Sequence, residues 1–409
     1  MPTTRLLCAL LPCVLLTTPG CFQDNPDNLI GETAGDGDGD GDPGDGDGDP
    51  GDGDGDPGDG DGDPGDGDGD PGDGDGDPGP VCTPEETDCG GECVVLGEDP
   101  QHCGACGHDC LGGSCDAGTC GTVELASGKG RLFMVHVDQT SVYYGGDGTD
   151  VGRIDKDGTN DTVLVPAGPM ISDKEWCYDS AFTGDAIVWG NDWVQPGVRG
   201  CMTPDCAGGV QTFMPGLNLF AMAYDATNSR LYWNQGADLV SAAWPGGSMT
   251  TVVPGQNPRE ITTDGDFVYW VARLGNEDYH VRKRAVGGGN MIELALNRPQ
   301  AARLTVGGSK VFWSEPIGIV QAPLPNGIGG ADPQVFATAT QLLAMAADSS
   351  HLYWTSQQDG VGVVSRCPLA GCDGPPEILA QIDEAWGLTF DPVAIYFVTE
   401  TGFIYKVAK

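Results

Sequence analysis

The chain has 409 residues and a net charge of −42, with 61 acidic residues against 19 basic ones. Residues 1–120 hold 30 of the acids and a single base, whereas the remainder holds 31 acids and 18 bases, a net charge of −13. Nucleic-acid binding needs a basic surface, and the sequence contains no basic cluster, so nucleic acid is disfavoured as a partner.

Residues 1–20 have the pattern of a secretory signal peptide. One early base, Arg5, precedes an apolar run over residues 6–16 that is too short for a membrane-spanning helix, which needs about 20 apolar residues. The stretch resembles the signal of bacterial lipoproteins, in which a Cys directly after a small-residue box is lipid-modified. This resemblance implies lipidation at Cys21 and attachment to the outer membrane or cell surface, with ordinary cleavage and secretion as the alternative.

Residues 21–80 are predicted to be a disordered acidic tether. Over residues 44–78 the heptapeptide GDGDGDP repeats five times without an apolar side chain, so nothing offsets the entropy of ordering this backbone. A calcium site is the alternative, since DGDGDG at 36–41 matches the first half of an EF-hand loop. The second half fails, because its twelfth position is Asp47 instead of Glu. We therefore expect a spacer that attracts calcium only weakly, and no cofactor.

Residues 81–121 are predicted to form a small disulfide-rich module. Eight cysteines lie within 39 residues, which suits an oxidising compartment and implies four disulfides of undetermined pairing. A zinc site is the alternative, because a Cys-x2-Cys pair lies between His102 and His108. The core DP-x-x-CGACG-x-x-C resembles modules found in front of larger domains in bacterial surface lipoproteins, which implies a spacer or interaction module. The cysteines are Cys82, Cys89, Cys93, Cys103, Cys106, Cys110, Cys115 and Cys120.

Residues 122–409 are predicted to be a β-propeller with seven blades, six and eight being the alternatives. An apolar triplet recurs at spacings of 37 to 45 residues, beginning at Val142, Ile187, Leu231, Val268, Val311, Leu352 and Ile395. Four short strands per ~43 residues is the period of a propeller blade. Continuous apolar triplets indicate strands buried on both faces, and a sandwich of two large sheets would not explain their recurrence. The fold class is therefore all-β.

The sequence also predicts how the propeller closes. The last repeat ends after its third strand, while TVELA at 122–126 stands as an extra fourth strand ahead of the first repeat. That segment would complete the last blade and leave no open edge. The Tyr-Trp pairs of the triplets resemble those of the YWTD and NHL-type extracellular propellers. The resemblance implies an exported protein that binds another protein, a glycan or a peptide.

Five further cysteines lie within the propeller. Cys201 with Cys206 and Cys367 with Cys372 are each expected to form a disulfide that clips the turn between a third and a fourth strand. Cys177 has no obvious partner, and we expect it to be a buried free thiol.

No catalytic motif is recognisable: the sequence lacks a nucleophile elbow, an HExxH motif and a P-loop, and its single histidines near strands are expected to be structural. Propeller geometry favours a ligand site on the face where the loops enter the inner strands. Arginine and aromatic residues are favoured anchors there, although the same residues could be ordinary loop residues. The candidate ligand face comprises Asp173, Glu175, Trp176, Arg259, Glu260, Arg298, Glu384 and Trp386.

The sequence thus favours a lipid-anchored binding or scaffolding protein over an enzyme. The alternative is a metal-dependent propeller hydrolase, lactonase or lyase, which would need several of these carboxylates to converge on one metal ion. A structural envelope protein without a small ligand is the third reading.

Overall fold

The computed structural model describes residues 81–409 except 147, 167–179, 192–196, 217, 218, 220, 276, 325–332, 359, 373 and 383. The expected signal, lipidation site and tether therefore lie outside the described residues, as does Cys177. The described residues form β-strands, and no helix among them is long and apolar enough to cross a membrane.

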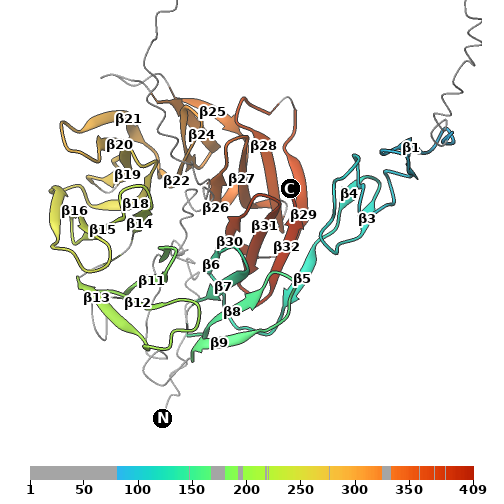
Figure 1. The fold of residues 1–409 in the computed structure, drawn as a ribbon. Coiled ribbons are helices and arrows are strands. Elements are labelled where there is room, and N and C mark those ends of the chain that lie inside the picture. The colour runs from blue at the N-terminus through green and yellow to red at the C-terminus, as the bar shows by residue number, and fades with distance from the viewer. Residues whose placement is uncertain are drawn as a thin grey trace, which may run out of the picture.

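Seven antiparallel four-stranded sheets surround a common centre (Figure 1), which confirms the all-β class and the seven blades. Blade 1 consists of β6 (Met134–Val137), β7 (Ser141–Gly145), β8 (Val151–Asp155) and β9 (Thr162–Val165). Blade 2 consists of β10 (Ser180–Phe182), β11 (Ala186–Asn191), β12 (Gly197–Met202) and β13 (Gln211–Pro215). Blade 3 consists of β14 (Met222–Asp225), β15 (Arg230–Gln235), β16 (Asp238–Ala243) and β17 (Thr250–Val253).

The next three blades follow the same order. Blade 4 consists of β18 (Pro258–Thr263), β19 (Phe267–Arg273), β20 (Tyr279–Ala285) and β21 (Ile292–Arg298). Blade 5 consists of β22 (Ala302–Gly307), β23 (Lys310–Glu315), β24 (Gly318–Pro323) and β25 (Gln334–Ala337). Blade 6 consists of β26 (Thr340–Ala347), β27 (His351–Gln358), β28 (Val361–Pro368) and β29 (Glu377–Gln381). In every blade the first strand is innermost and contacts the first strands of its neighbours.

Blade 7 joins the two ends of the propeller. It consists of β30 (Ala385–Phe390), β31 (Ala394–Thr399), β32 (Ile404–Ala408) and, from the other end of the ring, β5 (Val123–Ala126). Residue pairs such as Ile404 with Ala126 and Tyr405 with Glu124 fix the register of this antiparallel pairing. The predicted closure is confirmed, and blade 7 has four strands like the other blades.

The recurring triplets lie on the second strand of each blade, where neighbouring blades bury them from both sides. Trp233, Trp270, Trp313 and Trp354 are fully buried at equivalent positions of blades 3 to 6. Each apolar cluster within the propeller joins adjacent blades: Leu125, for example, packs in one cluster with residues of blades 1 and 7. This two-sided burial explains why the strands show continuous apolar runs instead of alternation.

The disulfide-rich module lies beside blade 7 and contains two hairpins, β1 (Thr87–Asp88) with β2 (Cys93–Val94) and β3 (Cys115–Asp116) with β4 (Thr119–Cys120). It contacts the propeller through His108, whose Nε2 lies 2.8 Å from the carbonyl oxygen of Lys409. Ala408 packs against the buried cysteines of the module, and Leu111 packs against the blade 7 cluster. The module is therefore docked against blade 7, at the end of β32.

All twelve described cysteines are in disulfides. Within the propeller, Cys201–Cys206 and Cys367–Cys372 each join the third strand of a blade to the turn that follows it. The module contains Cys82–Cys93, Cys89–Cys106, Cys103–Cys115 and Cys110–Cys120.

Candidate functional site

The candidate ligand face lies at one end of the propeller channel. Because strands alternate in direction, the start of each first strand, the end of each fourth strand and the turn between second and third strands share this end, which we call the entry end. Arg259 and Glu260 start β18, Arg298 ends β21, and Trp386 follows Ala385 at the start of β30. Asp173, Glu175 and Trp176 lie outside the described residues, so their placement stays a prediction.

β-Bulges mark the entry end in blades 4 to 7. The pairing of the first two strands shifts by an extra residue or more within 258–260, 302–305, 340–344 and 385–387. Arg259 and Trp386 are themselves bulge residues, and Arg303 within the second bulge has a positive φ of 46°. Bulges re-aim side chains and are enriched next to functional sites, and non-glycine residues rarely adopt positive φ. Four consecutive bulges single out this end of the channel.

Glu260 forms an ion pair with Arg303 across the seam between blades 4 and 5. A carboxylate oxygen of Glu260 lies 3.5 Å from Nη1 of Arg303, and both side chains are buried. Burial raises the pKa of the Glu260 carboxyl, and the positive charge of Arg303 opposes that rise. The pair joins two inner strands, so the sequence-predicted Glu260 serves interblade packing.

Arg298 forms a second ion pair across the same seam, with the base on blade 4 and the acid on blade 5. Its Nε and Nη2 donate to the two carboxylate oxygens of Glu315 at 2.6 and 2.9 Å. The Glu315 side chain is only 1% exposed and also accepts a hydrogen bond from the indole of Trp313 at 2.6 Å. A bidentate pair of this kind fixes geometry, so Arg298 is held in place by blade 5.

Trp386 belongs to a different cluster, which spans the seam between blades 7 and 1. Its ring meets Phe133 edge-on at a centroid distance of 5.3 Å, and the guanidinium of Arg131 lies 5.1 Å from the Phe133 centroid. Arg131 also pairs with Glu400, whose backbone NH donates to the carbonyl of Glu384 at 3.1 Å. We call Arg131, Phe133, Glu384, Trp386 and Glu400 the seam cluster. The Arg131 side chain is 55% exposed, so the cluster reaches the surface.

The candidate face therefore divides into two seams. Glu260 and Arg298 lie at the blade 4/5 seam, and Glu384 and Trp386 lie at the blade 7/1 seam. Burial, followed by the neighbouring charge of Arg273, lowers the pKa of Arg259. A partly exposed aromatic pair with an arginine is the composition of an interaction anchor.

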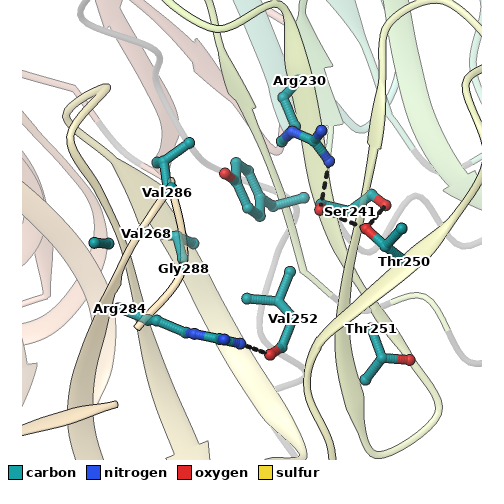
Figure 2. A pocket seen from close by; sticks show the side chains of 12 residues that line it. Arg230, Ser241, Thr250, Thr251, Val252, Val268, Arg284, Val286 and Gly288 are labelled. Carbon is teal, nitrogen blue, oxygen red and sulfur yellow. Dashed lines mark hydrogen bonds between the residues drawn. The ribbon is translucent and has the colours of Figure 1, made fainter. Parts of the chain in front are cut away.

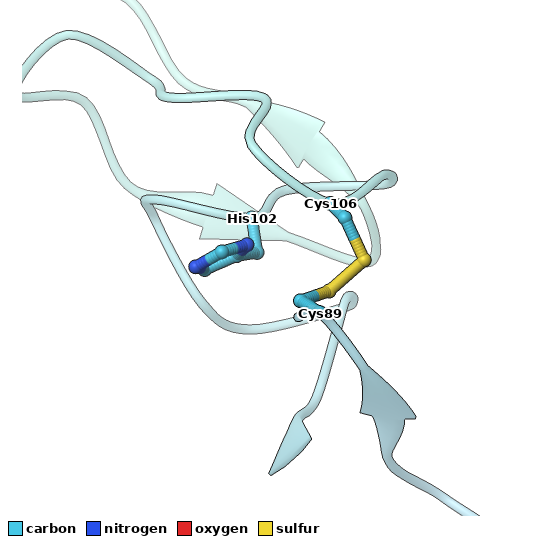
Figure 3. Close-up of side chains that lie close together, drawn as sticks. All are labelled: Cys89, His102 and Cys106. Atoms are coloured by element: carbon cyan, nitrogen blue, oxygen red, sulfur yellow. A yellow bond between two sulfur atoms is a disulfide. The ribbon is translucent and has the colours of Figure 1, made fainter. Parts of the chain in front are cut away.

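Among the described residues of this face, no group of three potential metal ligands lies close together. The only described groups of three potential ligands lie in the module, and both consist of disulfide cysteines, one with His102. Figure 3 shows Cys89 and Cys106 joined by their disulfide beside His102. Nδ1 of His102 accepts a hydrogen bond from the backbone NH of Gly107. Disulfide sulfurs are not thiolates, so the zinc alternative fails for these residues.

The histidines of the propeller have local structural partners. His136 is buried, with Nε2 3.0 Å from the hydroxyl of Ser180, and burial lowers its pKa to about 4. His280 contacts Asp278 at 2.8 Å, and His351 lies beside the hydroxyl of Ser350.

Several residues of this face were missed by sequence reasoning. Arg131 and Phe133 precede the first blade strand, Glu400 lies in a second-to-third strand turn, and Arg303 and Glu315 lie within blade 5. Position within the repeat could have revealed Glu400 and Glu315, since every second-to-third strand turn lies at the entry end.

Comparisons with known proteins agree on the fold. Virginiamycin B lyase from Staphylococcus aureus gives a TM-score of 0.55 at 14% identity, covering 71% of this chain and 98% of that chain. The WD40 repeats of RRP9 give 0.53 at 10% identity, covering 70% and 97%. A nidogen/laminin complex structure gives 0.45 at 16% identity, covering 61% and 97%. The first two likenesses, at 14% and 10% identity, show the propeller fold alone. No family model and no curated protein matches the chain.

Proposed function

We propose that this protein is an exported, lipid-anchored binding protein that presents its propeller at a cell surface. Its partner would be an extracellular protein, glycan or peptide that contacts the entry end of the channel.

The export and anchoring part of the proposal is supported by the cysteine chemistry and the N-terminal sequence. Six disulfides suit an oxidising compartment. The signal pattern puts Cys21 where a lipid would be attached, and the Gly/Asp/Pro repeat over residues 44–78 lies between Cys21 and the disulfide-rich module. A flexible chain of 45 residues has a root-mean-square length of roughly 35 to 40 Å, enough to hold the propeller clear of a membrane.

The observation that carries the binding part is the seam cluster. Trp386, Phe133 and Arg131 come from two blades that meet only because the ring closes, and their rings and guanidinium remain partly accessible. Partly buried aromatic and arginine side chains supply the largest contributions at protein interfaces. The ion pair of Arg131 with Glu400 holds the guanidinium beside the ring.

The partner can be sought with arrays of extracellular glycans and proteins, probed with the full chain. A true partner should bind the wild type and be lost with Trp386→Ala. The matched control is Phe267→Ala, which removes a half-buried ring at the opposite end of the propeller and should keep binding. Absence of any wild-type signal, or equal binding by Trp386→Ala, would contradict the proposal.

The anchor has a separate test in bacterial cells fed a labelled fatty acid. The wild-type protein should carry the label and fractionate with membranes, whereas Cys21→Ala should carry none and appear in the soluble fraction. An unlabelled wild-type protein would refute the anchor and leave the binding proposal standing.

A further inference from the structure

A groove opens between blades 3 and 4 at the end of the propeller opposite the seam cluster (Figure 2). Arg230 starts β15, Thr250 starts β17, and Arg284 lies next to the end of β20, all at this opposite end. The groove has a volume of about 220 Å³. That is below the ~300 to 1,000 Å³ of pockets for drug-sized ligands and suits one sugar ring or small organic acid. None of its described lining residues is acidic, in a strongly acidic chain.

A recurring hydrogen bond elsewhere in the propeller provides the comparison for this groove. In four blades the tyrosine of the triplet donates its hydroxyl proton to an aspartate five residues earlier, in the turn between the first two strands. The four pairs are Tyr143 with Asp138, Tyr269 with Asp264, Tyr353 with Asp348 and Tyr396 with Asp391. In each pair the aspartate also accepts backbone hydrogen bonds within its turn.

Blade 3 departs from this pattern. Its turn is two residues longer, so Asp225 precedes Tyr232 by seven residues. Asp225 instead accepts hydrogen bonds from the backbone NH and the side-chain amide of Asn228 at 2.9 and 2.8 Å. Within the described part of the chain the Tyr232 hydroxyl has no hydrogen-bond partner, although the side chain is only 1% exposed and lines the groove. The hydroxyl that other blades use structurally is thus available to a ligand.

Neither arginine of the groove has a carboxylate partner among the described residues. Arg230 donates to the hydroxyl of Ser241 at 2.9 Å, and Arg284 donates to the carbonyls of Val252 and Gly289. These neutral acceptors orient the guanidinium groups without neutralising them (Figure 2). Asp225 is opposite Arg230 in the strand register, but its oxygens accept from Asn228.

We propose that this groove binds an acidic sugar. The guanidinium group of Arg284 would hold its oxyanion at one end of the groove, and Tyr232, Ser241, Thr250 and, at the other end, Arg230 would hydrogen-bond its remaining oxygens. Guanidinium groups suit carboxylate and sulfate because they donate several hydrogen bonds in a planar array. The side chains of Val252, Val268 and Val286 supply the apolar part of the lining that small-ligand sites need.

The protonation of Tyr232 suits a hydrogen-bond donor to the ligand. Burial and the nearby charge of Asp225 raise the pKa of Tyr232 to about 12, against the opposing charge of Arg230. The phenol therefore stays protonated at neutral pH and can donate a hydrogen bond to an oxyanion. The groove is remote from the seam cluster, so this proposal stands apart from the proposed partner and from the anchor.

The test is calorimetric titration of the full chain with glucuronate, glucose 6-sulfate and glucose. At least one charged sugar should bind, and glucose should bind at least about tenfold more weakly, because it lacks the charged group that the guanidinium would hydrogen-bond. Binding of both charged sugars would support recognition of the shared oxyanion, and binding of one would identify which oxyanion the groove accepts.

Two variants and two matched controls locate the site. Arg284→Gln should weaken binding about tenfold and Tyr232→Phe about fivefold. Arg366→Gln removes a guanidinium whose partner is Glu377, and Tyr353→Phe removes a hydroxyl already bonded to Asp348, so both should keep the wild-type affinity.

The proposal would be overturned by any of three results: no charged sugar binds, glucose binds equally well, or the controls lose as much affinity as the groove variants. Thermal unfolding of each variant checks that it is folded. If Arg284→Gln fails to fold, Tyr232→Phe decides, because it deletes one oxygen that has no described partner.

Discussion

Replacing the buried His136 should remove a defined part of the acid sensitivity of this propeller. His136 lies on β6, stacks on Phe182 and is 3.0 Å from the Ser180 hydroxyl. Burial lowers its pKa to about 4, whereas an unfolded chain has a histidine pKa of about 6.5. Between these values the unfolded chain binds a proton that the folded chain does not. Acidification therefore favours unfolding through this residue.

The size of the effect follows from the same two pKa values. A difference of about 2.5 pH units corresponds to about 3 kcal/mol of unfolding free energy, and about 2 kcal/mol of it is lost between pH 7 and pH 5. The lowered pKa values of Asp348 and Asp391, which Lys409 and Lys156 hold down against burial, matter only below about pH 4. The window from pH 7 to pH 5 therefore isolates the imidazole from these carboxylates.

The assay is urea unfolding of the wild type and of His136→Gln at pH 7 and pH 5. The variant keeps a side-chain NH but does not titrate, so its loss of stability over this window should be smaller than that of the wild type by about 2 kcal/mol. Using the difference between the two proteins cancels the contribution of all other titrating groups. Equal losses in the two proteins would refute a neutral, buried imidazole at this position.

Two further predictions concern the seams between blades. Leu125→Ala on β5 should lower the free energy of unfolding in urea by about 2 to 5 kcal/mol, because the side chain is buried between blades 7 and 1. The control Val163→Ala, on the exposed outer strand of blade 1, should lower it little, and similar losses in the two variants would contradict closure by β5. Arg298→Gln should lower the free energy of unfolding by roughly 3 kcal/mol, because it leaves the buried Glu315 unpaired. Adding Glu315→Gln should recover part of that loss, and additive losses would contradict the ion pair.

The number of blades and the closure of the ring were predictable because the apolar triplet recurs once in every blade. Each triplet, such as the one beginning at Leu231, has to be apolar on both faces, and its period fixes the strand count per blade. The extra strand at 122–126 could fill only one position in the ring, because blade 7 alone lacked a fourth strand. Both inferences needed only the local pattern and the count.

The details of the entry end could not be predicted, because they depend on which side chains of neighbouring blades face each other. Glu260 and Arg303 are 43 residues apart and meet only when the inner strands of blades 4 and 5 lie side by side. The bulge at Trp386 changes the direction of a side chain without changing the hydrophobic pattern. The partners of Glu260, Arg298 and Trp386 therefore could not be assigned from the sequence.

The measurement that most directly tests binding against metal-dependent hydrolysis is a calcium titration of the full chain by calorimetry, followed by lactone and ester turnover assays. The account predicts only weak uptake that disappears at higher salt, as expected for the spaced aspartates of the N-terminal repeat, and no turnover. Saturable binding of one calcium ion that resists salt, is abolished by Asp173→Asn with Glu175→Gln and accompanies turnover would contradict it.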